Sequence, residues 1–168
     1  MVFSSLRRKP SLIVFDLDYT LWPFDCDDYY GSKLYERNGE VFDQSNNPVK
    51  PYPHSEDVLS RIKQEPGIKL AVASMTSSPK VGHKLIKLYG WDKYFDYLEI
   101  YPTSKTKHFK ALTQKSDIPY DQMMFFDDMS FNIHEIGKLG VHAVQVHNGV
   151  DFPFLRRALE QFDRASVA

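Results

Sequence analysis

The stretch that decides the fold is Leu12-Ile13-Val14-Phe15-Asp16-Leu17-Asp18-Tyr19-Thr20. The apolar run at its start is typical of a strand buried on both faces of a parallel sheet. The run ends abruptly in aspartates, and ligands of open α/β sheets bind just beyond the carboxyl ends of the strands. We therefore predict a central buried strand over 11–15 with candidate site residues at its end.

Apolar runs and helical patterns alternate through the rest of the chain. Further strands are predicted over 68–73, 97–101, 122–126 and 141–146, and helices over 54–64, 79–89, 131–139 and 154–162, with one more helix beginning near Ser104. This alternation is typical of βαβ crossovers, which produce a parallel sheet with helices on both faces. We therefore predict an α/β fold, a three-layer α/β/α Rossmann-like domain with a central parallel sheet.

The length of 168 residues, without a linker, predicts a single domain over 1–168. Residues 1–10 lack the apolar run of a secretory signal, and we interpret them as a short N-terminal arm on the surface. Residues 25–52 are polar and contain Asn38-Gly39, a strong signal for a β-hairpin. We expect this insertion after the first strand to form a small hairpin flap.

Charge and composition narrow the choice of partners. The 21 Lys and Arg residues nearly balance the 22 Asp and Glu residues, so there is no large field of one sign, and we predict no nucleic-acid partner. No stretch approaches the roughly 20 consecutive apolar residues of a membrane helix, so we predict no membrane partner. A lone cysteine, Cys26, favours a reducing compartment, so we expect the cytoplasm, with the nucleus as an alternative. We also expect the protein to be a monomer.

Acidic residues follow two of the predicted strands. Asp16 and Asp18 are two apart, so they point to the same side of an extended chain, and Asp127 and Asp128 follow the strand over 122–126. Either pair alone is typical of a turn or a helix cap. Carboxylates gathered at one sheet edge repel, and they persist only where a cation neutralises them or one keeps its proton. Oxygen ligands without histidine or thiolate favour Mg²⁺.

Two further polar residues complete a set suited to phosphate chemistry. Ser74 follows the strand over 68–73, and Lys105 begins a helix shortly after the strand over 97–101. Alone, each has a plainer interpretation, a helix cap for Ser74 and a solvated side chain for Lys105. With both acidic pairs at the same sheet edge, a hydroxyl and an ammonium group indicate phosphoryl transfer.

The motif Asp16-Leu17-Asp18-Tyr19-Thr20 matches the D-x-D-x-T signature of the haloacid dehalogenase superfamily of phosphatases. The longer string over 15–24 resembles the magnesium-dependent phosphatase 1 group within that superfamily. The likeness continues through segments 73–74, 100–105, 108–109, 125–128 and 139–141, and it spans nearly the whole chain. All these motifs in order, at predicted strand ends, make the resemblance specific.

The resemblance implies a role for each acid. Asp16 would be the nucleophile that forms an aspartyl-phosphate, and Asp18 the general acid and then base, its pKa raised by partial burial and by the charge of Asp16. Mg²⁺ would be held by the Asp16 carboxylate, the Asp18 backbone carbonyl and the Asp127-Asp128 pair. Asp128 is the expected direct ligand and Asp127 the partner of Lys105, although the sequence leaves their order open.

The resemblance also implies the phosphate contacts. They would come from Leu17, Thr20, Ser74, Met75 and Lys105, with Lys105 also catalytic. Thr20 would brace the loop through its hydroxyl, and the Met75 backbone N–H would assist Ser74. Met75 departs from the resembled pattern, in which arginine commonly follows this serine, and this leaves substrate preference open.

The function implied is a magnesium-dependent phosphomonoester hydrolase. The predicted elements fill the intervals from Asp18 to Ser74 and from Ser74 to Lys105, so we expect a capless, open site. Phosphoproteins, including phosphotyrosine, and phosphorylated small molecules such as phosphosugars both suit it. A receiver-like or catalytically inactive phosphate-binding signalling module is the alternative; Asp18 disfavours a receiver, because an acid/base group drives turnover.

The remaining candidate residues give weaker evidence for a functional role. Tyr19, Trp22 and Phe24 follow the nucleophile loop and are expected as an aromatic rim for substrate, with core packing as the alternative for Phe24. The histidines show no spacing typical of a metal triad, and only His108, one turn beyond Lys105, is expected near the site. Cys26 is interpreted as inert, because no basic residue lies near it in the sequence.

Overall fold

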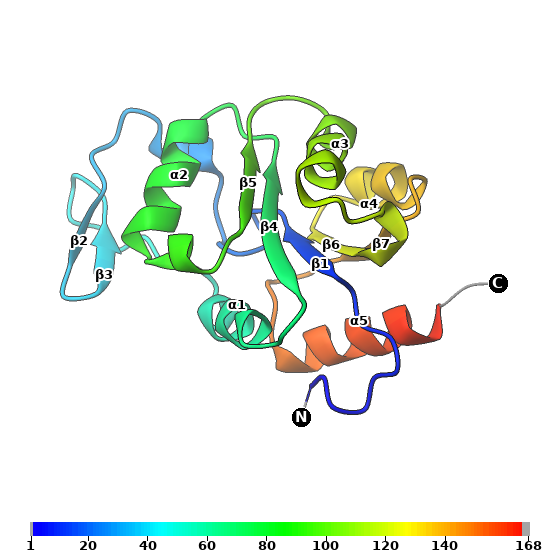
Figure 1. The fold of residues 1–168 in the computed structure, drawn as a ribbon. Coiled ribbons are helices and arrows are strands. Elements are labelled where there is room, and N and C mark those ends of the chain that lie inside the picture. The colour runs from blue at the N-terminus through cyan, green and yellow to red at the C-terminus, as the bar shows by residue number, and fades with distance from the viewer. Residues whose placement is uncertain (1, 166–168) are drawn as a thin grey trace.

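A computed structural model describes residues 2–165. Its centre is a five-stranded sheet in the order β5-β4-β1-β6-β7, with every neighbouring pair parallel (Figure 1). The strands are β1 (Leu12–Phe15), β4 (Lys69–Ser74), β5 (Tyr97–Ile100), β6 (Met123–Asp127) and β7 (His142–Gln145). The predicted α/β fold is confirmed, and the motif strand β1 is the central strand of the sheet.

Helices cover both faces of this sheet. They are α1 (Ser55–Lys63), α2 (Pro79–Leu88), α3 (Lys105–Ser116), α4 (Ser130–Gly137) and α5 (Phe152–Arg164). Ile13 and Phe15 of β1 join the core cluster under α1, α2 and α5, whereas Leu12 and Val14 join the cluster under α3 and α4. The side chains of β1 thus alternate between two apolar layers, which is why the motif strand is apolar at every position.

The predicted hairpin flap is present beside α2 (Figure 1). It consists of β2 (Tyr35–Arg37) and β3 (Glu40–Phe42), paired antiparallel. Asn38 and Gly39 between them have φ of 54° and 81°, the left-handed conformations that a tight two-residue hairpin turn requires. Between β1 and β4 the chain forms only this hairpin, a 3₁₀ helix and α1, which leaves the sheet edge without a cap.

Most predicted element boundaries hold within two residues, but local details differ. Three short 3₁₀ helices, Cys26–Tyr29, Trp91–Lys93 and Tyr120–Gln122, were not predicted. The interpretation of residues 1–10 as a surface arm is wrong for Phe3, whose ring is buried in the core, and for Arg8, which donates to the carbonyls of Phe162 and Asp121. Met1 lies outside the described residues. Within residues 2–165, no helix combines the length and apolarity needed to span a membrane.

Candidate active site

The topology brings the predicted site residues to one edge of the sheet. Asp16 directly follows β1, Ser74 ends β4, Asp127 ends β6, and Lys105 is the first residue of α3. Since β4, β1 and β6 are adjacent and parallel, their carboxyl ends meet. They border a pocket of about 360 Å³, whose lining includes Asp16, Asp18, Tyr19, Ser74, Met75, Lys105, Asp128 and Met129.

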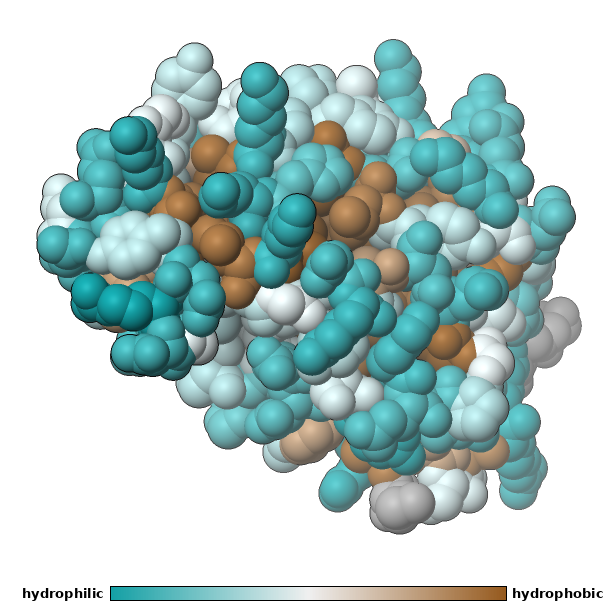
Figure 2. Space-filling model, turned by 60° about the vertical axis from the view of Figure 1, so that its left-hand side comes forward, coloured by the Kyte–Doolittle hydropathy of each residue, from teal (hydrophilic) through white to brown (hydrophobic). Residues whose placement is uncertain are grey.

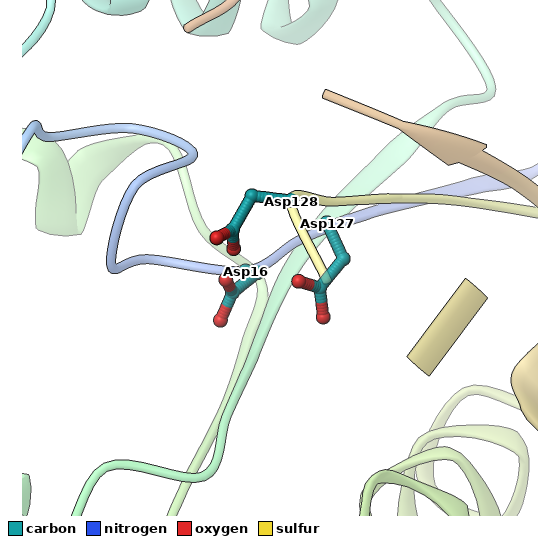
Figure 3. A group of neighbouring side chains, drawn as sticks. All are labelled: Asp16, Asp127 and Asp128. Atoms are coloured by element: carbon teal, nitrogen blue, oxygen red, sulfur yellow. The ribbon is translucent and has the colours of Figure 1, made fainter. Parts of the chain in front are cut away.

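Three carboxylates converge there. Asp16, Asp127 and Asp128 each offer an oxygen, and these oxygens lie within 4.8 Å of one another (Figure 3). Asp16 and Asp127 are buried and Asp128 is half-buried. One ammonium group, that of Lys105, contacts the cluster, so three negative charges and one positive charge leave a surplus of two negative charges when all are ionised. All-oxygen ligands with this surplus fit a divalent cation such as Mg²⁺.

The Lys105 ammonium group is completely engaged. It donates to the Ala73 carbonyl at 2.6 Å, to Asp16 Oδ1 at 3.0 Å and to Asp127 Oδ2 at 3.1 Å. Three N–H donors therefore meet three acceptors in a buried position. Burial by itself lowers the pKa of Lys105, but the two carboxylates outweigh it and raise the pKa above its ordinary value. Lys105 is a fixed cation.

Asp127 is held on both of its oxygens. Its Oδ1 accepts from the backbone N–H of Met129 at 3.0 Å, and its Oδ2 accepts from Asn132 Nδ2 at 2.9 Å in addition to Lys105. Asp128, by contrast, lines the pocket. Asn132 was not identified from the sequence; an amide near the start of the predicted helix, a few residues after the acidic pair, is the signal that could have found it.

Asp16 combines burial with two donors. Thr20 Oγ1 donates to Asp16 Oδ2 at 3.3 Å, while Lys105 contacts Oδ1. Burial raises the pKa of Asp16 well above its ordinary value; Lys105 lowers it, and Asp127 and Asp128 raise it further. A cation beside Asp16 would offset this cost and favour the ionised carboxylate.

The Asp18 carboxylate is not one of the three that converge. Its Oδ1 accepts from Trp22 Nε1 at 2.8 Å and from the Cys26 backbone N–H at 3.1 Å. Burial raises its pKa to about 6, the two hydrogen bonds oppose the rise, and Asp25 adds to it. Of the two expected causes, burial is the largest, whereas the neighbouring acid that raises the pKa of Asp18 is Asp25 and not Asp16. The Asp18 carboxylate lies outside the converging set, which is compatible with the expectation that Asp18 offers a metal its backbone carbonyl; that role stays a prediction.

The loop after β1 shapes the rest of the pocket. Tyr19 has a φ of 58°, and this left-handed residue lets its N–H donate to the Trp22 carbonyl at 2.7 Å. Trp22 is wrong as a rim residue, because its side chain is fully buried and stacks on Phe24 and Trp91. The Leu17 side chain is also buried in the core, so only its backbone could meet a phosphate.

Exposed apolar side chains surround the carboxylates. Tyr19, Met75 and Met129 line the pocket, at 45%, 42% and 54% exposed, and Phe131, 66% exposed, lines an adjoining hollow with Met75. We call these four residues the apolar collar. Of them, Met129 and Phe131 were not identified from the sequence as site residues. Phe131 begins a predicted helix, where an apolar residue is normally part of the core, and Met129 was not considered beside the acidic pair that precedes it. Ser74, which also lines the pocket, is buried, and its Oγ accepts from the Thr76 N–H at 3.3 Å.

His108, one turn beyond Lys105 in α3, is buried and has a lowered pKa. Its Nε2 lies 2.9 Å from the Tyr101 carbonyl, so the neutral ring donates there, while its buried Nδ1 has no hydrogen-bond partner within residues 2–165. Burial lowers the pKa of His108 to about 4. Between that value and the ordinary 6.5, the unfolded chain binds a proton that the folded protein does not, so stability is lost as the pH falls.

We expect His108→Gln to flatten the acid side of the stability profile. From pH 7 to pH 5, titration of His108 should remove about 2 kcal/mol of unfolding free energy, and the glutamine variant should lack this part. Urea unfolding in EDTA at both pH values measures it. The exposed His54 provides the matched control, His54→Gln, which should keep the wild-type dependence. An unchanged pH dependence in His108→Gln would contradict the assignment.

With the geometry established, comparison with known proteins identifies the family. The sequence model of the acid phosphatase family matches residues 8–165, and the chain belongs to this family. It is 42% identical over 163 residues to human magnesium-dependent phosphatase 1, covering 96% of this chain and 92% of the human protein. A haloacid dehalogenase-like hydrolase superfamily protein of Schizosaccharomyces pombe is 32% identical over 144 residues, covering 79% of this chain and 83% of that protein.

The fold agrees with this assignment. The N-terminal part of a Bacteroides fragilis protein, described as containing a phosphatase domain complexed with Mg, superposes with a TM-score of 0.64 at 16% identity. That match covers 92% of this chain and 39% of the other. An L-2-haloacid dehalogenase from Xanthobacter autotrophicus also has this fold, with a TM-score of 0.55. Together with the Schizosaccharomyces pombe relative, the family match confirms the haloacid dehalogenase superfamily expected from the D-x-D-x-T motif.

Proposed function

We propose that this protein is a magnesium-dependent phosphomonoester hydrolase that works through an aspartyl-phosphate on Asp16. The observation that carries the proposal is the carboxylate cluster, with its surplus of two negative charges, beside a buried ammonium group and a strand-end serine. The relatives support it, because the human protein is named a magnesium-dependent phosphatase and the Bacteroides structure holds Mg.

The cluster divides into a metal-binding part and a positioning part. Asp16 and Asp128, with the Asp18 backbone carbonyl, would hold Mg²⁺. Asp127 would position Lys105, because it accepts three hydrogen bonds, from Met129, Asn132 and Lys105, and does not line the pocket as Asp16 and Asp128 do. When bound, the ion would screen the repulsion between the phosphate and the attacking carboxylate.

In the first half-reaction, Asp16 attacks phosphorus while the bond to the leaving oxygen breaks. Lys105 and Thr20 orient the Asp16 carboxylate, and the Ser74 hydroxyl binds a phosphate oxygen. Asp18 gives its proton to the leaving oxygen and later takes one from the water that hydrolyses the aspartyl-phosphate. A pKa of about 6 suits both directions near neutral pH. Since the Trp22 and Cys26 N–H donors go to Oδ1, Oδ2 is favoured as the oxygen that carries this proton.

The apolar collar favours phosphotyrosine in a phosphoprotein over a phosphosugar. Tyr19, Met75 and Met129 offer apolar contacts beside the carboxylates, which suit the ring of an aromatic leaving group. A sugar would instead need polar partners for its hydroxyls. A receiver-like or inactive module is disfavoured by Asp18, whose raised pKa suits turnover. The buried free thiol of Cys26 fits the proposed cytoplasmic location.

Metal dependence provides the first test. We expect hydrolysis of p-nitrophenyl phosphate with Mg²⁺, its loss in excess EDTA, and its recovery when Mg²⁺ is restored. Mg²⁺ should also raise the melting temperature, because an ion that binds only the folded state stabilises it. In Asp128→Asn this rise should shrink. Full activity in EDTA would overturn the proposal. A parallel panel of phosphotyrosine and sugar phosphates tests the substrate preference.

A further inference from the structure

A second cavity lies beside α2, outside the carboxylate pocket. Its volume is about 630 Å³, and it lies between α2 and the segment that leads into β2. The lining residues are Gly31, Ser32, Lys33, Leu34, Tyr35, Lys80, Val81 and Lys84. On the face that carries the hairpin and α2, Figure 2 shows hydrophobic residues in a hollow, with long hydrophilic side chains rising around it. We call this cavity the basic groove.

The basic groove has an apolar floor and a rim of one charge. Leu34 is buried and Val81 partly buried, while Lys33, Lys80 and Lys84 are exposed around them. No acidic residue lines the groove, and within residues 2–165 none of these three lysines forms a salt bridge. The groove therefore offers unpaired positive charge next to apolar surface, although the whole chain carries a net charge of -1.

Two of these lysines, Lys80 and Lys84, occupy positions in α2 where a positive charge destabilises the helix. Lys80 is in the first turn of α2, which contains no acidic residue, and a cation there opposes the helix dipole. Lys84 is four residues further on, so two like charges repel on one helix face. Both effects disfavour the free protein, and an anionic ligand in the groove would relieve them.

The basic groove and the carboxylate pocket are lined by neighbouring residues of the segment that leads into α2. Ser77 lines the pocket and Lys80, three residues later, lines the groove. Two acids, Asp25 and Asp27, line this side of the pocket, and Asp27 accepts hydrogen bonds from the hydroxyls of Ser77 and Ser78. Since an extended chain advances about 3.3 Å per residue, a peptide with its phosphate in the pocket would enter the groove within a few residues.

We propose that the basic groove binds an acidic segment of a phosphoprotein substrate, a few residues from the phosphorylated side chain. Carboxylates of the peptide would pair with Lys33, Lys80 and Lys84, and an apolar side chain would rest on Leu34 and Val81. This inference rests on the proposed phosphatase function and adds a sequence preference to it. Charge complementarity and the apolar floor both favour a peptide of mixed acidic and apolar residues.

The test compares two phosphotyrosine peptides of equal length. One carries Glu residues and one Leu beside the phosphotyrosine, and the other carries Gln in place of Glu. We expect kcat/KM to favour the acidic peptide about tenfold at low salt, the size that a few exposed ion pairs give, and the preference to fall as salt rises. In Lys80→Gln/Lys84→Gln it should nearly vanish, while hydrolysis of p-nitrophenyl phosphate stays unchanged.

Matched controls separate the groove from general charge. Lys107→Gln/Lys110→Gln removes the same charge from exposed positions of α3 and should retain the preference. A preference that survives Lys80→Gln/Lys84→Gln, or falls equally in the control, would overturn the proposal. A competition assay provides a further control, in which a fluorescent, unphosphorylated acidic peptide is bound and then displaced. If a single-stranded oligonucleotide displaces it as well as the unlabelled peptide does, the groove binds any polyanion and the proposal is overturned.

The two proposals fail separately. If the protein hydrolyses no phosphomonoester, the phosphatase function fails, yet anisotropy of the labelled acidic peptide still reports whether Lys80 and Lys84 bind it. If p-nitrophenyl phosphate is hydrolysed with Mg²⁺ but the acidic and neutral peptides are equivalent in both assays, only the groove proposal fails.

Discussion

Asp16→Asn should lower the Mg²⁺-dependent turnover of p-nitrophenyl phosphate by at least about a thousandfold. An amide cannot attack phosphorus in place of the carboxylate, and no other described acid has the same position at the end of β1. The fold should survive, because burial already disfavours the ionised form of the Asp16 carboxyl and raises its pKa. Replacing it with a neutral amide of the same size removes that unfavourable buried charge. Steady-state phosphate release, with a thermal melt as the control for folding, gives the result.

The covalent intermediate separates a nucleophile from a mere metal ligand. After a brief reaction with a radiolabelled phosphomonoester and quenching in acid, wild-type protein should retain label and Asp16→Asn should retain none. Asp18→Asn should retain at least as much as wild type, because activation of the hydrolytic water is impaired. A labelled Asp16→Asn protein, or activity within tenfold of wild type, would assign the nucleophile elsewhere.

The fold was predictable because its signals are local. The apolar run of β1, the Asn38-Gly39 turn and the Gly90 that follows α2 each report on a few neighbouring residues, and the alternation of strands and helices then fixes a parallel sheet. Because the carboxyl ends of parallel strands meet, the convergence of Asp16 and Asp127 follows from topology. The observed strand order β4-β1-β6 explains why motifs distant in sequence share one pocket.

What the sequence could not predict depends on tertiary contacts. Asn132 reaches Asp127 only because α4 turns back over the end of β6. The different environments of Asp127 and Asp128 depend on where three donors lie, which residue types do not reveal. Trp22 was expected on the rim because aromatic residues follow the motif, but Phe24 and Trp91 provide a stacking site that buries it. Phe3 is likewise buried by a tertiary contact, because the Arg61 guanidinium group lies over its ring.

Lys105→Met should be costly for both stability and catalysis. The change leaves Asp16 and Asp127 buried without their shared cation, and breaking a buried pair in this way costs about 3 to 5 kcal/mol of unfolding free energy. Without Lys105, which lowers it, the pKa of Asp16 should rise further, so the folded variant binds a proton that the unfolded chain does not. Its deficit relative to wild type should therefore widen from pH 5 to pH 8. Turnover should fall by about two to three decades, since Lys105 also orients the Asp16 carboxylate.

A double-mutant cycle with Asp127→Asn isolates the ion pair. Asparagine retains an acceptor for the Met129 N–H and removes the charge that Lys105 faces at 3.1 Å. Lys105→Met/Asp127→Asn should therefore be less destabilised than the sum of the single variants, because the double variant has one fewer uncompensated buried carboxylate. Urea unfolding in EDTA at pH 8 measures all four corners. Strict additivity, or a Lys105→Met protein as stable as wild type, would mean that the ammonium group does not neutralise this cluster. The surplus of two negative charges, which argues for a divalent cation, would then no longer hold.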